Sequence, residues 1–225
     1  MFQESHSNFS YPLGVLNHNR KGIFMKNSIT GKRVAILVDN GFEHSEFMEP
    51  MKAIKEAGGE AVIVSPKEKV KSWKSGNWGE EFTVDLQLKE AKAEDFDGLV
   101  LPGGVINPDL LRINEDALEF VRGFFGEEAQ KPVAAICHGP WTLINAGLVK
   151  DRKMTSYESI KMDLMNAGAK WVDEKVVVDK GLITSRNPDD LPAFCSKVIE
   201  EIREGRHRVE THKTKEIPAN AHPKS

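Results

Sequence analysis

The stretch 132–140 constrains the fold more than any other part of the chain. Residues 133–136 form a short apolar run, which is typical of a strand buried on both faces. The run ends abruptly in Cys137 and His138, and Gly139-Pro140 then favours a tight turn into a helix. This order of strand, sharp turn and helix predicts an α/β protein that presents a nucleophile on an elbow.

Cys137 is the candidate nucleophile. It follows the carboxyl end of the strand and precedes a helix expected over 141–148, where the helix dipole and free backbone N–H groups favour a thiolate. We therefore expect a lowered pKa for this thiol. The alternative is that Cys137 is a small core residue, since free cysteines are often buried. The adjacent His138 and the Gly-Pro turn favour the nucleophile.

Composition indicates one domain with extensions. The 225 residues are 40% hydrophobic and 29% charged, which is ordinary for a folded domain of generous size. The two cysteines, Cys137 and Cys195, give no disulfide framework, and Cys195 is expected only to pack. No apolar run approaches membrane-spanning length and the first 30 residues lack the apolar core of a secretory signal, so we expect a cytoplasmic protein with no membrane partner.

The charge distribution supports a division into a flexible N-terminal extension (1–32), an α/β domain (33–205) and a disordered C-terminal tail (206–225). Residues 1–33 hold five Lys or Arg and one acidic residue, and the tail holds five Lys or Arg and two acidic residues. The segment 34–205 therefore holds 21 Lys or Arg and 31 acidic residues. That excess of ten negative charges argues against a phosphate-binding surface on the folded part and against nucleic acid as an electrostatic ligand. Met25 is an alternative start to Met1.

Other elements follow from hydrophobic patterning. Buried strands are expected over 33–39, 60–65, 97–101 and 153–157, an antiparallel excursion over 69–88, and a hairpin over 171–178 and 182–185. Helices are expected from about 43 to 57, 115 to 125, 160 to 166 and from 189 onward.

Two further strand ends carry polar groups beside the expected nucleophile. Glu46 comes after the first strand, and Gly103 and Gly104 come directly after the strand 97–101. Because the carboxyl ends of adjacent parallel strands share one crevice, Glu46 can approach Cys137, and the glycines allow close backbone approach to a reactive atom. Charge in the first turn of a helix is the alternative explanation for Glu43 and Glu46, and an ordinary turn for the glycines.

Histidine placement narrows the chemistry. The region 33–205 holds only His44 and His138, so a triad with a late histidine after the nucleophile has no base. Cys137 and His138 are adjacent, and no second Cys/His pair has ligand spacing, so we expect no metal site and no cofactor.

The assembled motifs resemble those of the PfpI-type intracellular protease and general stress protein family, in the superfamily of the parkinsonism-associated protein deglycase. The motifs are FEHSE (42–46), LPGG (101–104), AICHGP (135–140), TSY (155–157), TSR (184–186) and DDLPAF (189–194). The resemblance implies a flavodoxin-like three-layer α/β sandwich with a mostly parallel central sheet, assembled into homodimers or homohexamers.

The same resemblance implies roles for individual residues. Cys137 is the nucleophile, Glu46 is hydrogen-bonded to it, and the backbone of Gly104 and His138 supplies oxyanion contacts. Family members place an acid of a neighbouring subunit against this histidine, and the matching position is Asp109, where the archaeal proteases have glutamate. The shorter side chain counts against peptidase activity. The remaining residues assigned to substrate binding, beside Gly104, are Gly103, Glu43 and Tyr157.

We expect a cysteine-dependent stress-response hydrolase that acts on methylglyoxal, glyoxal or early glycation adducts of proteins or peptides. Cys137 attacks a hemithioacetal or aminocarbinol carbon, Glu46 and His138 shuttle protons, and water releases lactate or glycolate. Peptide hydrolysis by the same thiol is one alternative. A non-catalytic stress protein or holdase that uses the cysteine as an oxidation sensor is another. Nucleic acid is expected only as a glycated substrate.

Overall fold

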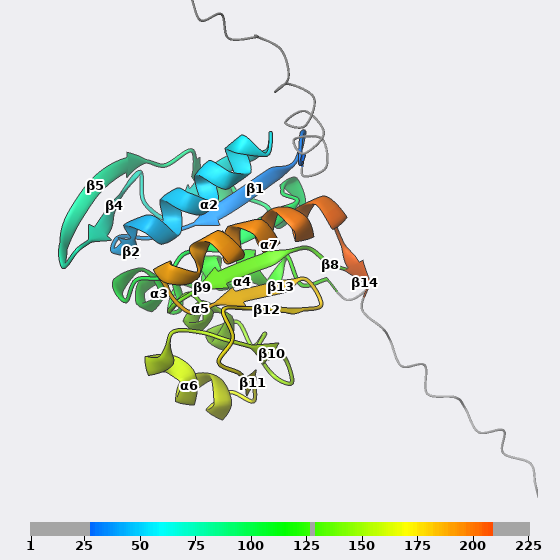
Figure 1. The fold of residues 1–225 in the computed structure, drawn as a ribbon. Helices are drawn as coiled ribbons and strands as arrows, with labels where there is room; N and C mark the ends of the chain where they lie inside the picture. The colour runs from blue at the N-terminus through cyan, green and yellow to red at the C-terminus, as the bar shows by residue number, and fades with distance from the viewer. Residues whose placement is uncertain (1–27, 127–128, 209–225) are drawn as a thin grey trace, which may run out of the picture.

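The computed structural model describes residues 28–126 and 129–208, which are built around a seven-stranded sheet (Figure 1). Neighbouring strands are parallel except for β12, which runs antiparallel to β13. In order across the sheet, the strands are β12 (Val176–Asp179), β13 (Leu182–Ser185), β9 (Val133–Ile136), β7 (Gly98–Leu101), β1 (Arg33–Leu37), β3 (Glu60–Ser65) and β6 (Leu86–Gln87).

Helices cover both faces of this sheet and make the three-layer α/β sandwich that the sequence predicted. One apolar cluster joins the sheet to α2 (His44–Glu56) and α7 (Leu191–Glu204), which lie side by side in front of the sheet in Figure 1. A second cluster joins the other face to α3 (Ile106–Leu111), α4 (Glu115–Arg122) and α5 (Pro140–Asn145). The fold is flavodoxin-like with a mostly parallel central sheet.

The apolar content of the central strands explains their position. Residues 34–37 of β1 and 133–136 of β9 are fully or almost fully buried, because Val, Ile, Leu and Ala point alternately into the two clusters. Local signals set the helix ends: Asn114 accepts a hydrogen bond from the backbone N–H of Ala117 at the start of α4, and Pro140 occupies the first turn of α5.

Smaller sheets lie outside the central sheet. The remaining strands are β2 (Phe42–Glu43), β4 (Lys69–Lys74) and β5 (Asn77–Thr83) in one sheet, β10 (Lys153–Met154) and β11 (Lys170–Trp171) in another, and β8 (Ala129–Gln130) with β14 (His207–Arg208) in a third. The other helices are α6 (Lys161–Asn166) and the short 3₁₀ turns at Leu88–Glu90, Ala93–Asp95, Glu158–Ile160 and Pro188–Asp190.

Several boundaries differ from the sequence expectations. The antiparallel excursion expected over 69–88 is confirmed for 69–83, as β4 and β5, in which Trp73 and Trp78 pack edge to face at 5.5 Å. Its last part is different, because Leu86 and Gln87 form β6, which pairs parallel with β3 in the main sheet. The strand expected over 153–157 stops at Met154, and the N–H of the next residue, Thr155, donates to the side-chain hydroxyl of Thr184 on β13. Trp171 belongs to β11 and not to the hairpin, which is formed by β12 and β13 alone.

The domain reaches beyond both expected boundaries. Ile29 is only 2% exposed and donates its N–H to Ala57, so residues 28–32 belong to the folded domain and not to a flexible extension. At the other end, β14 pairs with β8, and His207 lies 2.8 Å from the buried carboxylate of Glu201. Residues 206–208 are therefore not a disordered tail. The rest of both expected extensions lies outside the described residues.

Strand order also fixes where a site can form. The chain passes from β1 to β3 and β6 on one side, then crosses to β7, β9 and β13 on the other. The carboxyl ends of β1 and β7 therefore flank a topological switch point, where open α/β sheets hold their ligands. In the described part of the chain, no helix is long and apolar enough to cross a membrane.

Candidate active site

A sharp turn after β9 presents Cys137 at this switch point. Its backbone φ is +61°, a left-handed conformation that residues other than glycine rarely adopt. Its N–H donates to Ser185 of β13 at 3.0 Å, and its carbonyl accepts from Tyr157 at 3.0 Å. Glycine is required two residues later, because a Cβ at Gly139 would lie 2.5 Å from the carbonyl oxygen of Leu101. The turn is thus held from both sides, as an elbow requires.

Glu46, in the first turn of α2, lies completely buried beside the thiol. Its Oε2 accepts the N–H of Gly103 at 2.9 Å, while its Oε1 is buried without a hydrogen-bond partner of good geometry in the described structure. Burial raises the pKa of Glu46 to about 8, although the hydrogen bonds from Gly103 and from the thiol of Cys137 oppose it. The carboxyl group therefore carries its proton at neutral pH, next to Cys137.

The electrostatics of Cys137 correct one sequence expectation. Burial, and then the nearby Glu46 carboxyl, raise the pKa of this thiol, whereas the backbone N–H groups of Gly104 and His138 lower it. The predicted lowering fails because the thiol is almost enclosed, with Cys137 7% exposed, and burial outweighs the effect of the backbone N–H groups. A thiol in this state needs a base to become a nucleophile.

His138 is the candidate base beside this thiol. Its Nδ1 lies 3.2 Å from the sulfur of Cys137, and its Nε2 lies 3.0 Å from the hydroxyl of Ser159. The ring stacks on Tyr157 with centroids 4.9 Å apart and meets Trp141 edge-on at 5.2 Å. Burial lowers the pKa of His138, so the imidazole is neutral and can accept the thiol proton.

A glycine-containing loop after β7 closes the site. Gly103 donates its N–H to Glu46, whereas the N–H of Gly104 lowers the pKa of the Cys137 thiol. A Cβ at Gly103 would lie 2.6 Å from Glu46 Oε2 and 2.7 Å from the Cβ of Cys137. Gly104 has a φ of +74° and would clash with the backbone of Gly41. Only glycine fits at both positions.

Two polar residues of the site were not predicted from the sequence. Asn107 is fully buried, accepts the N–H of Asp39 after β1 at 2.7 Å and donates to the carbonyls of Pro102 and Gly103. It therefore ties the ends of β1 and β7 together. Ser159, on the 3₁₀ turn after Tyr157, positions the far nitrogen of His138. No sequence signal separated either residue from ordinary loop Asn and Ser.

Glu43 and Asp109 lie at the edge of the site. Glu43 is half-buried, and its charge contributes to the raised pKa of Glu46. Asp109 projects from α3 with 61% of its side chain exposed and pairs with Arg112 at 3.4 Å. Within this chain it does not bond to His138. Its link is indirect, since the Arg112 guanidinium lies over the ring of Trp141, which packs against that histidine.

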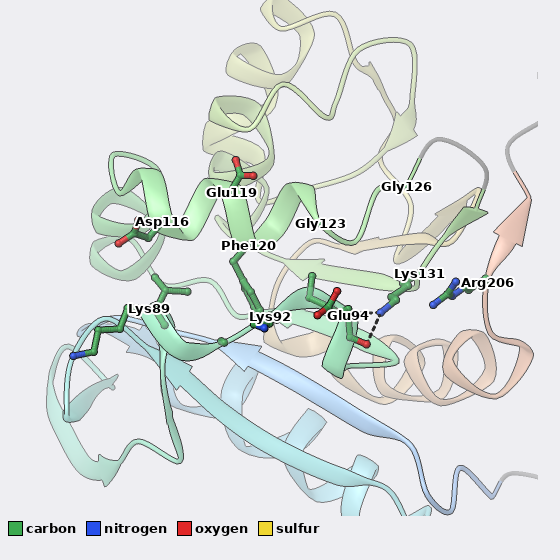
Figure 2. Close-up of a pocket in the computed structure, with 13 residues that line it drawn as sticks. Lys89, Lys92, Glu94, Asp116, Glu119, Phe120, Gly123, Gly126, Lys131 and Arg206 are labelled. Atoms are coloured by element: carbon green, nitrogen blue, oxygen red, sulfur yellow. Dashed lines mark hydrogen bonds between the residues drawn. The ribbon is translucent and has the colours of Figure 1, made fainter.

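Two grooves differ in their relation to the site. One of about 450 Å³ begins at Tyr157 and is lined by Lys161, Trp171 and Arg186 among others, so it adjoins the stacking partner of His138. Another, of about 750 Å³, runs between α4 and the 88–95 connection (Figure 2) and holds no candidate nucleophile. There the ammonium of Lys131 donates to the backbone carbonyls of Ala93, Glu94 and Phe96, so that lysine is structurally engaged. No group of three or more His, Cys, Asp or Glu that could hold a metal ion occurs in the described residues.

The fold and site together define an α/β protein with a buried cysteine, histidine and protonated glutamate around a nucleophile elbow. A sequence profile of the DJ-1/PfpI family matches residues 32–201, and the chain belongs to this family. Among curated relatives, General stress protein 18 of Bacillus subtilis is 47% identical over 165 residues, covering 73% of this chain and 94% of its own length. YraA of the same organism, named as a candidate cysteine protease, is 44% identical, covering 72% and 94%.

Other relatives carry the name deglycase. Deglycase PfpI of Pyrococcus furiosus is 42% identical over 171 residues, covering 76% of this chain and 99% of its own. Among solved structures, a two-domain protein of Anabaena variabilis with a DJ-1/ThiJ/PfpI-like domain and a ferritin-like domain superposes with a TM-score of 0.71 at 38% identity. That match covers 76% of this chain and 48% of the larger one. The family resemblance recognised in the motifs is confirmed.

Proposed function

We propose that the protein is a cysteine-dependent enzyme that converts methylglyoxal, glyoxal or their early adducts with amines into lactate or glycolate. The observation that carries the proposal is the trio of a buried thiol, a neutral imidazole 3.2 Å from its sulfur, and a carboxyl group held protonated beside it. Such a site can take one proton from the thiol and return another to a reacting carbon or oxygen. The names of the deglycase relatives support the substrate class.

The first step forms a carbon–sulfur bond. The thiol proton of Cys137 passes to Nδ1 of His138 as the sulfur adds to the aldehyde carbon of methylglyoxal, which gives a hemithioacetal. Attack on an aminocarbinol adduct gives the same species, and the amine leaves with a proton. The backbone N–H groups of Gly104 and His138, which lower the pKa of the Cys137 thiol, are the donors we assign to the developing alkoxide.

The second step moves a proton between carbons. A proton leaves the carbinol carbon and another arrives at the former ketone carbon, so the hemithioacetal becomes a lactoyl thioester with no net oxidation. Glu46 and His138 are the groups that can carry these protons. Water then hydrolyses the thioester, which releases lactate and restores the Cys137 thiol. Glyoxal follows the same sequence to glycolate.

The test is a product assay on the purified full chain. Methylglyoxal is supplied and lactate is measured with enantiomer-specific dehydrogenases, in parallel with an unstructured peptide substrate. Cys137→Ser is expected to abolish lactate release, whereas Cys195→Ser, the matched control, is expected to cost some stability and little activity. Lactate release that persists in Cys137→Ser, or none from the wild type, would overturn the proposal.

Peptide hydrolysis is the second candidate, and the relative named as a candidate cysteine protease favours it. The low exposure of Cys137 and His138, at 7% each, argues for a small substrate over an extended peptide. Cleavage of the peptide without lactate formation would establish this alternative. If neither product forms and peroxide readily oxidises Cys137, a non-catalytic redox sensor is favoured.

Assembly into dimers or hexamers is part of the proposal. The α3 region exposes Val105, Ile106, Leu110 and Ile113, the last by 74%, around the exposed Asp109. A second copy seated here would bury this apolar face and bring Asp109 to another subunit's site. Activity per chain should then fall on dilution, and Ile113→Asp should lower both the oligomeric mass and turnover. A fully active monomer would exclude the shared site.

A further inference from the structure

A second groove, of about 510 Å³, lies at the opposite edge of the sheet from the thiol. Gln130, which lines it, precedes β9, whereas Cys137 follows the other end of that strand. The β12–β13 turn and the start of β10 form its other walls. Its location separates this groove from the proposed chemistry.

The groove is lined mainly by positively charged side chains, although the net charge of the whole chain is negative. Five cationic side chains line it against two carboxylates, Asp151 and Asp179. Among the described residues, only Lys153 of the five forms an ion pair, with Glu174 at 2.9 Å. The other four are Lys150, Arg152, Lys170 and Lys180.

Arg152 is the residue that distinguishes this groove from a patch of surface lysines. It is half-buried and packs on the ring of Phe125 at 5.1 Å, and burial lowers its pKa while the charge of Asp179 opposes that change. Its guanidinium donates one hydrogen bond to the side-chain oxygen of Gln130 and one, of 3.1 Å, to the backbone carbonyl of Asp179. Three of its five N–H groups are then free to donate to a ligand. A half-buried cation without a counter-ion in contact is costly and is relieved by an anion.

Gln130 adds a second unsatisfied group. It is 2% exposed, and its Oε1 faces the guanidinium of Arg152, which fixes the amide orientation because a flipped amide would oppose two donors. Its Nε2 is then buried without a hydrogen-bond partner in the described structure. The pair therefore has spare donors on both members, and both members line the groove.

We propose that this groove binds a small phosphorylated ligand, a phosphate ester or a diphosphate, whose oxygens accept from Arg152 and neutralise Lys150, Lys170 and Lys180. Arginine N–H groups match phosphate oxygens in geometry and charge. The groove volume suits a small molecule. A long polyanion would extend onto a domain that carries ten excess negative charges between residues 34 and 205, so nucleic acid is the less favourable occupant.

Binding of pyrophosphate, inorganic phosphate, glucose 6-phosphate and a 20-mer of thymidylate to the full chain, measured by calorimetry at low ionic strength, tests the assignment. The paired change Lys150→Gln/Lys170→Gln removes two exposed charges and should weaken pyrophosphate binding by about tenfold. Arg152→Gln should weaken it further. The matched control is Lys67→Gln/Lys71→Gln, two exposed lysines outside the groove, which should bind as the wild type does.

The outcomes are distinct. Binding of pyrophosphate that is lost in the groove variant and kept in the control, with both variants melting as the wild type does without ligand, supports the site. Tighter binding of glucose 6-phosphate than of inorganic phosphate identifies an ester as the ligand type, and the reverse identifies a free phosphate. Equal loss in both variants, or no binding at millimolar pyrophosphate, overturns the proposal. So does binding of the oligonucleotide that pyrophosphate does not displace.

Discussion

The buried proton of Glu46 should make the stability of this protein fall as the pH rises through neutrality. In the native state the pKa of Glu46 is about 8, against an ordinary value of 4.5 in the unfolded chain. Between these values the native protein holds a proton that the unfolded chain has released, so the free energy of unfolding decreases with pH. The loss is fully developed above pH 8 and absent below about pH 4.5.

The difference of pKa sets the size of the effect. At about 1.4 kcal/mol for each pH unit, Glu46 alone should lower the free energy of unfolding by about 4 kcal/mol between pH 5 and pH 8.5. Glu46→Gln keeps an oxygen for the N–H of Gly103 and cannot ionise, so the variant lacks this loss. Relative to the wild type, it should gain about 4 kcal/mol over the same range.

Urea unfolding of both proteins at half-unit pH intervals measures the difference directly, because all other titrating groups are shared. Glu49→Gln, an exposed position one turn along α2, is the matched control and should track the wild type at every pH. A free-energy gap between Glu46→Gln and the wild type that stays constant from pH 5 to pH 8.5 would show that Glu46 is ionised in the native site. The same variant should lose most turnover, since an amide cannot carry the proton.

Three further predictions concern the surroundings of the site and the chain ends. Gly103→Ala should lower the melting temperature and the turnover together, because its Cβ would meet Glu46 and the backbone of the elbow. Ser159→Ala should reduce kcat by about tenfold and shift the acid limb of the pH–rate profile, because His138 loses the partner of its Nε2. Deleting residues 1–27 should leave the melting temperature unchanged, whereas deletion through residue 32 should cost about 2 kcal/mol or more through loss of the buried Ile29.

Each of these predictions has a control. Gly103 has no left-handed φ, so its substitution is penalised by steric contact alone. Gly76→Ala, at a left-handed φ with open space around it, is the control outside the site and should leave turnover unchanged. Ser159→Thr keeps a hydroxyl and should restore the pH profile, and an unchanged profile in Ser159→Ala would assign that serine a structural role only. Equal melting temperatures for the two truncations would show that Ile29 contributes nothing to the core.

Sequence patterns predicted the parallel strands and the elbow because both depend on local signals. The apolar runs at 33–37 and 133–136 and the Gly-Pro turn identify themselves through spacing and composition. The meeting of Glu46 with Cys137 was also accessible, because parallel strands bring their carboxyl ends to one edge. These expectations needed topology and no atomic detail.

The features that the sequence did not predict depend on contacts between distant segments of the folded chain. Asn107 and Ser159 act through partners 68 and 21 residues away, and polar loop residues of these types occur throughout any chain. The expected lowering of the Cys137 pKa considered the helix and omitted burial, which dominates in the folded site. The net charge of the sequence likewise gave no indication of the positive groove around Arg152, because its lysines come from separate segments that meet only in the folded protein.

The left-handed backbone at Cys137 implies a compromise between activity and stability at that one position. A φ of +61° is strained for a residue with a Cβ, at a cost of about 1–3 kcal/mol, and glycine removes the cost. Cys137→Gly is therefore expected to be inactive, yet to fold more stably than Cys137→Ala, although alanine buries more apolar surface. The rest of the domain stabilises a local conformation that opposes folding, so the strain falls at the residue that the proposed reaction uses as its nucleophile.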